Sequence, residues 1–128
     1  MLRQVEVFRP YTDEFPEHLL LAEGADDQCL TLWAEAEMLR VAKRGEEVLG
    51  AYAMVRLDTE RFLLHGIVVA PPVRHQGLGR WLTGHAIGVA ESKGGRYLEL
   101  ADTGGSRCFA RMGFERAADS FHFAMIPE

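Results

Sequence analysis

The stretch Leu64–Leu82, LHGIVVAPPVRHQGLGRWL, decides the fold of this chain. Its first half, up to Pro71, is almost wholly apolar, which is typical of a strand buried on both faces. After Pro72 the apolar residues recur at helical spacing, beginning with Leu78 and Leu82. The stretch therefore predicts a buried strand, a glycine-rich loop and a long amphipathic helix, in that order.

The loop Arg74–Gly79, called the 74–79 loop below, has the properties of an anion site. The first turn of a helix leaves amide N–H groups without partners at the positive end of the helix dipole. A loop wrapped around that end suits a phosphate, and glycines let the backbone approach closely. Arg74, His75 and Arg80 concentrate positive charge in a chain whose formal net charge is −5. The loop is thus predicted to bind a pyrophosphate.

Two familiar phosphate-binding loops are excluded by the residues present. A P-loop requires a lysine followed by serine or threonine after its last glycine, and no such lysine stands here. A dinucleotide fingerprint requires a third glycine three residues after Gly79, where this chain has Leu82, and no βαβ unit opens the chain.

Alternation and helical spacing assign the rest of the chain. Hairpin-type turns at 44–46 and 58–60 predict an antiparallel meander in the middle of the sequence. Segment 25–35 is ambiguous and favours a short helix. Trp81 falls on the apolar stripe of the long helix and is expected to pack in the core. The predicted strands are 2–8, 38–43, 47–57, 62–69, 96–101, 114–116 and 120–126, and the predicted helices are 14–23, 25–35, the one from Leu78 to Gly94, and a short one carrying Cys108, Phe109 and Met112.

Composition narrows the class of protein. A length of 128 residues predicts one domain, 1–128. The acidic net charge argues against nucleic-acid binding. Cys29 and Cys108 are expected to be free thiols in a reducing cytoplasm, and no spacing suggests a metal site. No apolar stretch has the length of a signal peptide or a membrane span, so a cytoplasmic protein without membrane association is expected.

Three motifs together resemble the GNAT (GCN5-related N-acetyltransferase) superfamily. Arg74, Gly77 and Gly79 match its acetyl-CoA signature R/Q-x-x-G-x-G/A. Val69–Pro71 stands where the family has V-x-P at the end of a strand, and Cys108–Phe114 looks like its F-Y-x-x-x-G-F helix end. The order of the expected elements also fits. Each motif alone is weak, but their combination at these distances is a strong signal.

The resemblance implies an α+β fold. It predicts a GNAT-type mixed, mostly antiparallel central sheet of six to seven strands, flanked by about four helices in the order βααβββαβαββ. The strand that holds Ile67–Val69 is expected to carry a bulge near its end and to splay from the strand at Tyr97–Leu100. Bulges near active sites commonly re-aim the backbone in this way.

The resemblance also implies where acetyl-CoA would bind. Amides of Gln76–Arg80 would hold the pyrophosphate, and main-chain groups of Ile67 and Val69 would hold the pantetheine arm. An amide near Val68 would polarise the thioester carbonyl. The implied coenzyme contacts are Ile67, Val68, Val69, Arg74, His75, Gln76, Gly77, Leu78, Gly79, Arg80, Asp102 (where the family often has asparagine) and Phe109, a wall of the acyl pocket.

The acid and base positions depart from the family pattern. The usual tyrosine acid is Phe109, and Leu63 or Leu64 stands where many members have a glutamate base. An alkylammonium must lose its proton before it can attack, so another base is needed. His65 and Glu99 are the candidates, and a water chain is the alternative.

Two functions are compatible with these residues. The first is an N-acetyltransferase in which a primary amine attacks acetyl-CoA directly in a ternary complex. The amine could belong to a small molecule or a peptide. The second is a non-catalytic acetyl-CoA sensor that regulates a partner protein, a reading supported by the missing acid at Phe109. Dimers are common in the family, so the resemblance allows a homodimer.

Overall fold

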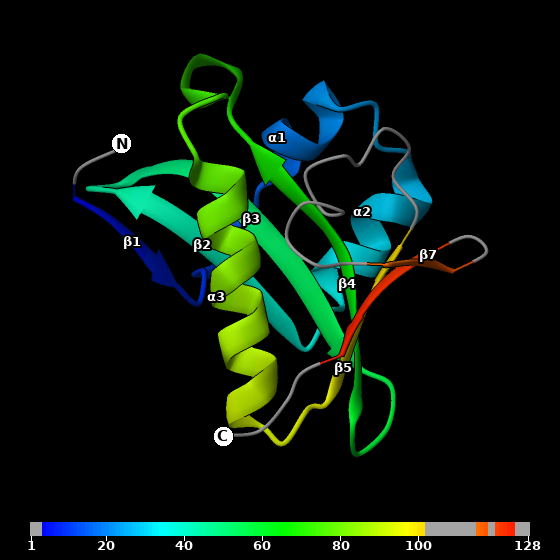
Figure 1. Ribbon diagram of the computed structural model, residues 1–128. Coiled ribbons are helices and arrows are strands. Elements are labelled where there is room, and N and C mark those ends of the chain that lie inside the picture. The colour runs from blue at the N-terminus through cyan, green and yellow to red at the C-terminus, as the bar shows by residue number, and fades with distance from the viewer. Residues whose placement is uncertain (1–3, 102–114, 118–119, 125–128) are drawn as a thin grey trace.

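The computed structural model describes residues 4–101, 115–117 and 120–124, which form one seven-stranded sheet with helices on both faces (Figure 1). The strand order is β1-β2-β3-β4-β5-β7-β6, and among these strands only β4 and β5 pair in parallel. The elements are β1 (Val5–Phe8), η1 (Thr12–Glu14), α1 (Glu17–Ala22), α2 (Asp27–Ala34), β2 (Met38–Arg44), β3 (Glu47–Arg56), β4 (Arg61–Val69), η2 (Pro71–Val73), α3 (Leu78–Ser92), β5 (Tyr97–Ala101), β6 (Glu115–Ala117) and β7 (Ser120–Ala124).

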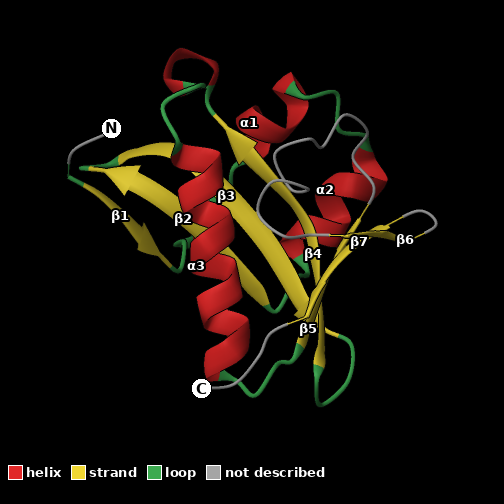
Figure 2. Cartoon of the chain, in the orientation of Figure 1, coloured by secondary structure: helices red, strands yellow, loops and turns green. Residues whose placement is uncertain are grey.

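The sheet separates two apolar cores (Figure 2). Helix α3 covers one face, where Leu82, Ala86 and Ala90 pack on side chains such as Tyr52 and Leu64. Helices α1 and α2 cover the other face, and there the buried side chains are Leu19, Leu20, Trp33, Val41, Ala51, Ala53 and Val68. Because β2, β3 and β4 lie between two cores, their sequences are apolar on both faces, as the sequence predicted for β4.

The predicted fold class is confirmed, and the described elements follow the predicted order. The predicted short helix that contains Cys108, Phe109 and Met112 lies outside the described residues. No described helix combines the length and the apolar character that crossing a lipid bilayer requires.

Two local predictions were wrong. The helix expected from Glu14 begins at Glu17, because Pro16 disfavours helical backbone at Phe15, which is extended (φ −57°, ψ 130°). Trp81 was expected in the core but is 36% exposed. The buried line of α3 runs through Leu82 and the residues four apart from it, and Trp81 stands at its edge.

A bulge interrupts the pairing of β3 with β4. Ala53 pairs with Gly66 and Met54 pairs with Leu64, which leaves His65 as the extra residue of β4. The parallel pairing of β4 with β5 stops at the same point, since it covers Arg61 to Leu64 only. A bulge is therefore present as predicted, but it lies at the middle of β4 rather than near its end, and the pairing with β5 ends beside it.

Close packing of α3 on the sheet depends on Gly50 in β3. A Cβ atom at this position would lie 2.9 Å from the carbonyl oxygen of Val68 and 3.1 Å from a methyl carbon of Leu82. The first of these neighbours is backbone and cannot move aside easily. Gly50 thus lets the N-terminal half of α3 lie directly on β3.

We expect Gly50→Ala to lower the free energy of unfolding by about 1–3 kcal/mol, the usual cost of overpacking a core. Gly88→Ala is the matched control, because Gly88 is exposed in the middle of α3 and nothing lies within 4 Å of its added Cβ. That variant should be more stable than the parent by up to about 1 kcal/mol, from helix propensity. Urea denaturation measures both. Equal stability of the two variants would contradict the packing role of Gly50.

Candidate active site

The N-terminus of α3 presents backbone donors without acceptors. Gly77 is its N-cap residue, with φ at +86° and no side-chain cap. The first hydrogen bond of the helix joins the Trp81 N–H to the Gly77 carbonyl (3.0 Å). Among the hydrogen bonds of the described residues, none uses the N–H of Leu78, Gly79 or Arg80. Three amides at the positive end of a helix dipole are therefore available to an anion.

Backbone geometry in the 74–79 loop explains its sequence. Gly77 lies in the left-handed region that favours glycine. His75 also has a positive φ (65°), which is uncommon for a residue with a side chain. An added Cβ on Gly79 would come 3.7 Å from a methyl carbon of Val69. The start of α3 therefore lies against the end of β4.

The open edge of β4 leads to this helix end. Between His65 and Val69, β4 pairs with β3 on one side but with no described strand on the other. Within the described part of the chain, no strand takes up the backbone groups on that side, so an extended ligand could bond to them as an added strand would. A row of main-chain groups thus runs into a cluster of helix amides, which suits a long molecule with a diphosphate at one end.

A family profile decides what this arrangement is. The profile of the Acetyltransferase (GNAT) family matches residues 5–114, which is most of the sequence. The chain belongs to the GNAT acetyltransferase family. A comparison with curated proteins gave no significant match.

Solved GNAT structures share the fold at low sequence identity. A GNAT family acetyltransferase from Elizabethkingia anophelis with acetyl-CoA bound is 23% identical, with 91% of this chain and 79% of that one covered and a TM-score of 0.77. IAA acetyltransferase from Bacillus cereus is also 23% identical, with 94% and 98% covered and a TM-score of 0.78. N-acetylglutamate synthase from Neisseria gonorrhoeae, complexed with coenzyme A and N-acetyl-glutamate, is 16% identical, with 96% and 35% covered and a TM-score of 0.79.

Arg74, the first residue of the GNAT signature, holds the 74–79 loop in place through two contacts. Its Nε donates to the carbonyl of Val69 (3.3 Å), and its guanidinium forms an ion pair with Glu23 at the end of α1. Arg74 therefore links the loop to both β4 and the α1–α2 segment. Spacing does not indicate Glu23 as the partner of Arg74, because the two residues are 51 positions apart in the sequence.

His65 is the bulged residue of β4, at which the regular alternation of side chains between the two faces of the sheet is interrupted. Leu64 points into the core beneath α3, whereas Val68 packs into the core beneath α1 and α2, so the side chains of β4 change faces across the bulge. Gly66, beside it, leaves room for Trp33, whose ring carbon would lie 3.4 Å from an added Cβ. His65 is half-buried, and burial lowers its pKa below the ordinary value of 6.5. The imidazole is therefore mostly neutral at pH 7 and able to accept a proton.

Glu99 is engaged in an ion pair. Both of its carboxylate oxygens accept from one nitrogen of Arg61, at 2.9 and 3.1 Å. Glu99 also raises the pKa of Arg61, chiefly through these hydrogen bonds. Glu99 is thus held by Arg61, whereas no hydrogen bond among the described residues includes the imidazole of His65. The two predicted site residues that follow β5 in the sequence, Asp102 and Phe109, lie outside the described residues.

A buried polar pair, which the sequence did not reveal, ties α3 to the sheet. The Tyr52 hydroxyl lies 2.8 Å from Nδ1 of His85. Burial raises the pKa of Tyr52 to about 12 and lowers that of His85, with the charge of Arg40 adding to the effect on His85. The phenol therefore keeps its proton, and it shares a hydrogen bond with a neutral imidazole. Because the partners are 33 residues apart, their spacing carries no sequence signal.

Proposed function

We propose that this GNAT protein is an N-acetyltransferase that transfers the acetyl group of acetyl-CoA to a primary amine by direct attack in a ternary complex. The observation that carries the proposal is the continuity of the open edge of β4 with the bare amides of α3. The GNAT neighbours from Elizabethkingia anophelis and Neisseria gonorrhoeae, described with acetyl-CoA and coenzyme A respectively, support the choice of coenzyme.

The residues present fit acetyl-CoA. Gly79 comes close to Val69 without a side chain between them, so a ligand can pass from β4 to the helix end along the backbone. Amides of Gln76 to Arg80 would hold the diphosphate, and main-chain groups of Ile67 to Val69 would hold the pantetheine arm. The coenzyme supplies the activated acetyl group as a thioester.

His65 is the proposed general base. The acceptor amine would approach β4 at its bulge, where His65 lies. A neutral imidazole there would take the proton that the amine nitrogen must lose as its bond to the acetyl carbon forms. An amide near Val68 would donate to the carbonyl oxygen as negative charge develops on it. Thiolate is a fairly good leaving group, so the reaction does not require a tyrosine at the Phe109 position.

Thiol release measures the proposed activity. Purified protein is mixed with acetyl-CoA and a panel of small-molecule and peptide amines, and free thiol is followed with a colorimetric reagent. Turnover with an amine, confirmed by the mass of the acetylated product, would support the proposal. Tight binding of acetyl-CoA without turnover across the panel would instead support the alternative function, a non-catalytic acetyl-CoA sensor.

A further inference from the structure

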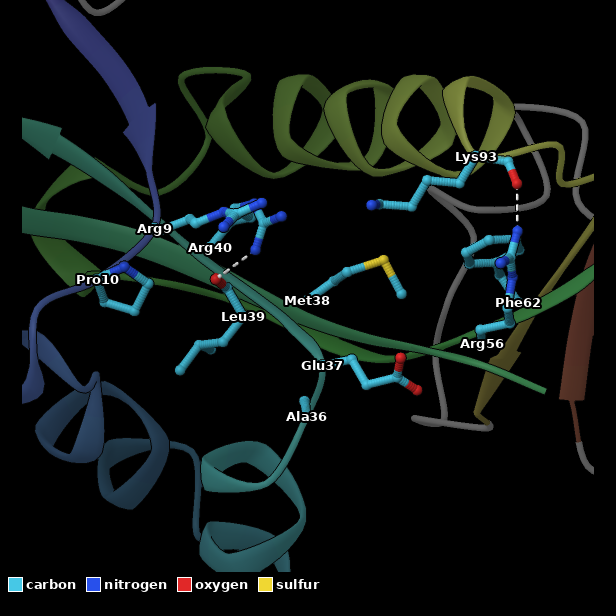
Figure 3. A pocket seen from close by; sticks show the side chains of 10 residues that line it. All are labelled: Arg9, Pro10, Ala36, Glu37, Met38, Leu39, Arg40, Arg56, Phe62 and Lys93. Atoms are coloured by element: carbon cyan, nitrogen blue, oxygen red, sulfur yellow. Dashed lines mark hydrogen bonds between the residues drawn. The ribbon is translucent and has the colours of Figure 1, made fainter.

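A cavity of about 390 Å³ lies on the α3 side of the sheet, at the opposite end of α3 from the 74–79 loop. Its floor includes Met38 and Phe62, which belong to the core beneath α3. The end of β1, the start of β2, the end of β3 and the end of α3 surround it (Figure 3). The residues that line it are Arg9, Pro10, Ala36, Glu37, Met38, Leu39, Arg40, Arg56, Phe62 and Lys93.

The cavity gathers four cationic side chains and one carboxylate. Figure 3 shows Lys93 pointing from the end of α3 toward the guanidinium groups of Arg9 and Arg40. Arg56 lies over the ring of Phe62, 5.0 Å from its centroid. Like charges that converge on one space repel each other unless an anion lies between them. The acidic net charge of the whole chain makes this local excess of positive charge more unusual.

These cations lack carboxylate partners within the part of the chain that the structure describes. None of its ion pairs includes Arg9, Arg40, Arg56 or Lys93. Arg40 is half-buried, and the only acceptor it has among the described residues is the carbonyl of Leu39 (3.0 Å). Burial, together with the charge of Arg9, lowers the pKa of Arg40. A partly desolvated guanidinium of this kind is stabilised when an anion binds to it.

We propose that this cavity is a second ligand site, which binds a small organic dianion carrying carboxylate or phosphate groups. Arg9, Arg40 and Lys93 would contact the anionic groups, and Met38 and Phe62 would contact the carbon skeleton. A volume of about 390 Å³ is in the range of small-molecule sites. Glu37 at the rim disfavours ligands of higher charge, and it could accept from a hydroxyl or amino group.

The second site is separate from the proposed coenzyme site. Helix α3 has 15 residues, so its two ends are about 22 Å apart at 1.5 Å per residue. The dianion and acetyl-CoA would therefore bind together rather than compete. The inference stands on the cavity and its charges, and it does not depend on the proposed acetyl transfer.

Calorimetry with defined anions tests the second site. Succinate and citrate represent carboxylates, and glycerol 3-phosphate and inorganic phosphate represent phosphates, each against sodium chloride at equal ionic strength. Titrations are made on the parent protein saturated with coenzyme A and on the Gly77→Glu variant, because both exclude binding at the 74–79 loop. We expect one organic anion to bind at one site in both samples. The carboxylate and phosphate series show which anionic group is preferred.

Charge removal locates the bound anion. The double variant Arg9→Gln/Lys93→Gln should bind at least about tenfold more weakly, since it removes two charges that face the ligand. Arg44→Gln/Arg96→Gln is the matched control, because both of these arginines are exposed and lie outside the cavity. It should bind like the parent. The proposal is overturned if no anion binds, if the two double variants bind equally well, or if binding disappears in Gly77→Glu.

Discussion

Gly77→Glu is expected to abolish coenzyme A binding while the protein remains folded. The new carboxylate would stand at the N-terminus of α3, beside the three amides that are free to bind a diphosphate. It would compete for those amides and repel the phosphates. An added Cβ on Gly77 has nothing within 4 Å, so no clash disturbs the core. We expect the affinity, measured by calorimetry, to fall by at least about 100-fold, equivalent to about 2.7 kcal/mol.

The control for backbone strain is Gly94→Glu. Gly94 has the same positive φ of 86°, also with open space around its Cβ, but follows the other end of α3. Both variants therefore carry the same cost of a side chain in left-handed backbone, about 1–2 kcal/mol. Gly94→Glu should bind coenzyme A as the parent does. If Gly77→Glu, folded by circular dichroism, bound coenzyme A with parental affinity, the assignment of the 74–79 loop would be wrong.

Replacing His65 with glutamine is expected to lower kcat by about 100- to 10,000-fold, the usual contribution of a general base. Glutamine keeps the polarity and approximate size of the side chain but cannot take up a proton near neutral pH. The affinity for coenzyme A, measured separately by calorimetry, should not change. Stopped or continuous thiol assays on the best amine of the panel give kcat and KM for both proteins.

The pH dependence separates a base from a merely structural residue. Burial lowers the pKa of His65 below 6.5, so kcat/KM of the parent should rise with pH through a value below 6.5. That acidic limb should be missing in His65→Gln. Glu99→Gln is the comparison, because Glu99 is bound to Arg61 and should leave the limb in place. A full acidic limb in His65→Gln, or its loss in Glu99→Gln, would exclude His65 as the base.

Local chemistry explains why the fold and the loop could be predicted from the sequence. The 74–79 loop could be predicted because its residues are contiguous in the sequence. Gly77, with its positive φ, and the apolar stripe that follows it determine the local backbone over neighbouring residues. A bulge near the end of β4 was expected only from the family resemblance, and nothing in the alternation of β4 marks His65 as the extra residue. The helix start at Glu17 was missed because a proline in the first turn and a proline before the helix give similar patterns.

Contacts between distant segments could not be predicted. The partner of Arg74 is Glu23, the partner of Glu99 is Arg61, and the partner of His85 is Tyr52. Each pair depends on how the helices sit on the sheet, and spacing in the sequence does not encode it. The basic cavity is a further case, because its residues come from five separate parts of the sequence between Arg9 and Lys93.

The parallel ladder between β4 and β5 has a mechanical consequence. Its four residue pairs are the only strand pairing, among the described strands, that joins the β1–β4 plate to the plate formed by β5, β7 and β6. Beyond these four residue pairs, the two parts of the sheet diverge from each other. A molecule bonded to both parts of the sheet would cross-link them. Binding of such a molecule would therefore raise the resistance of the protein to heat and to proteases.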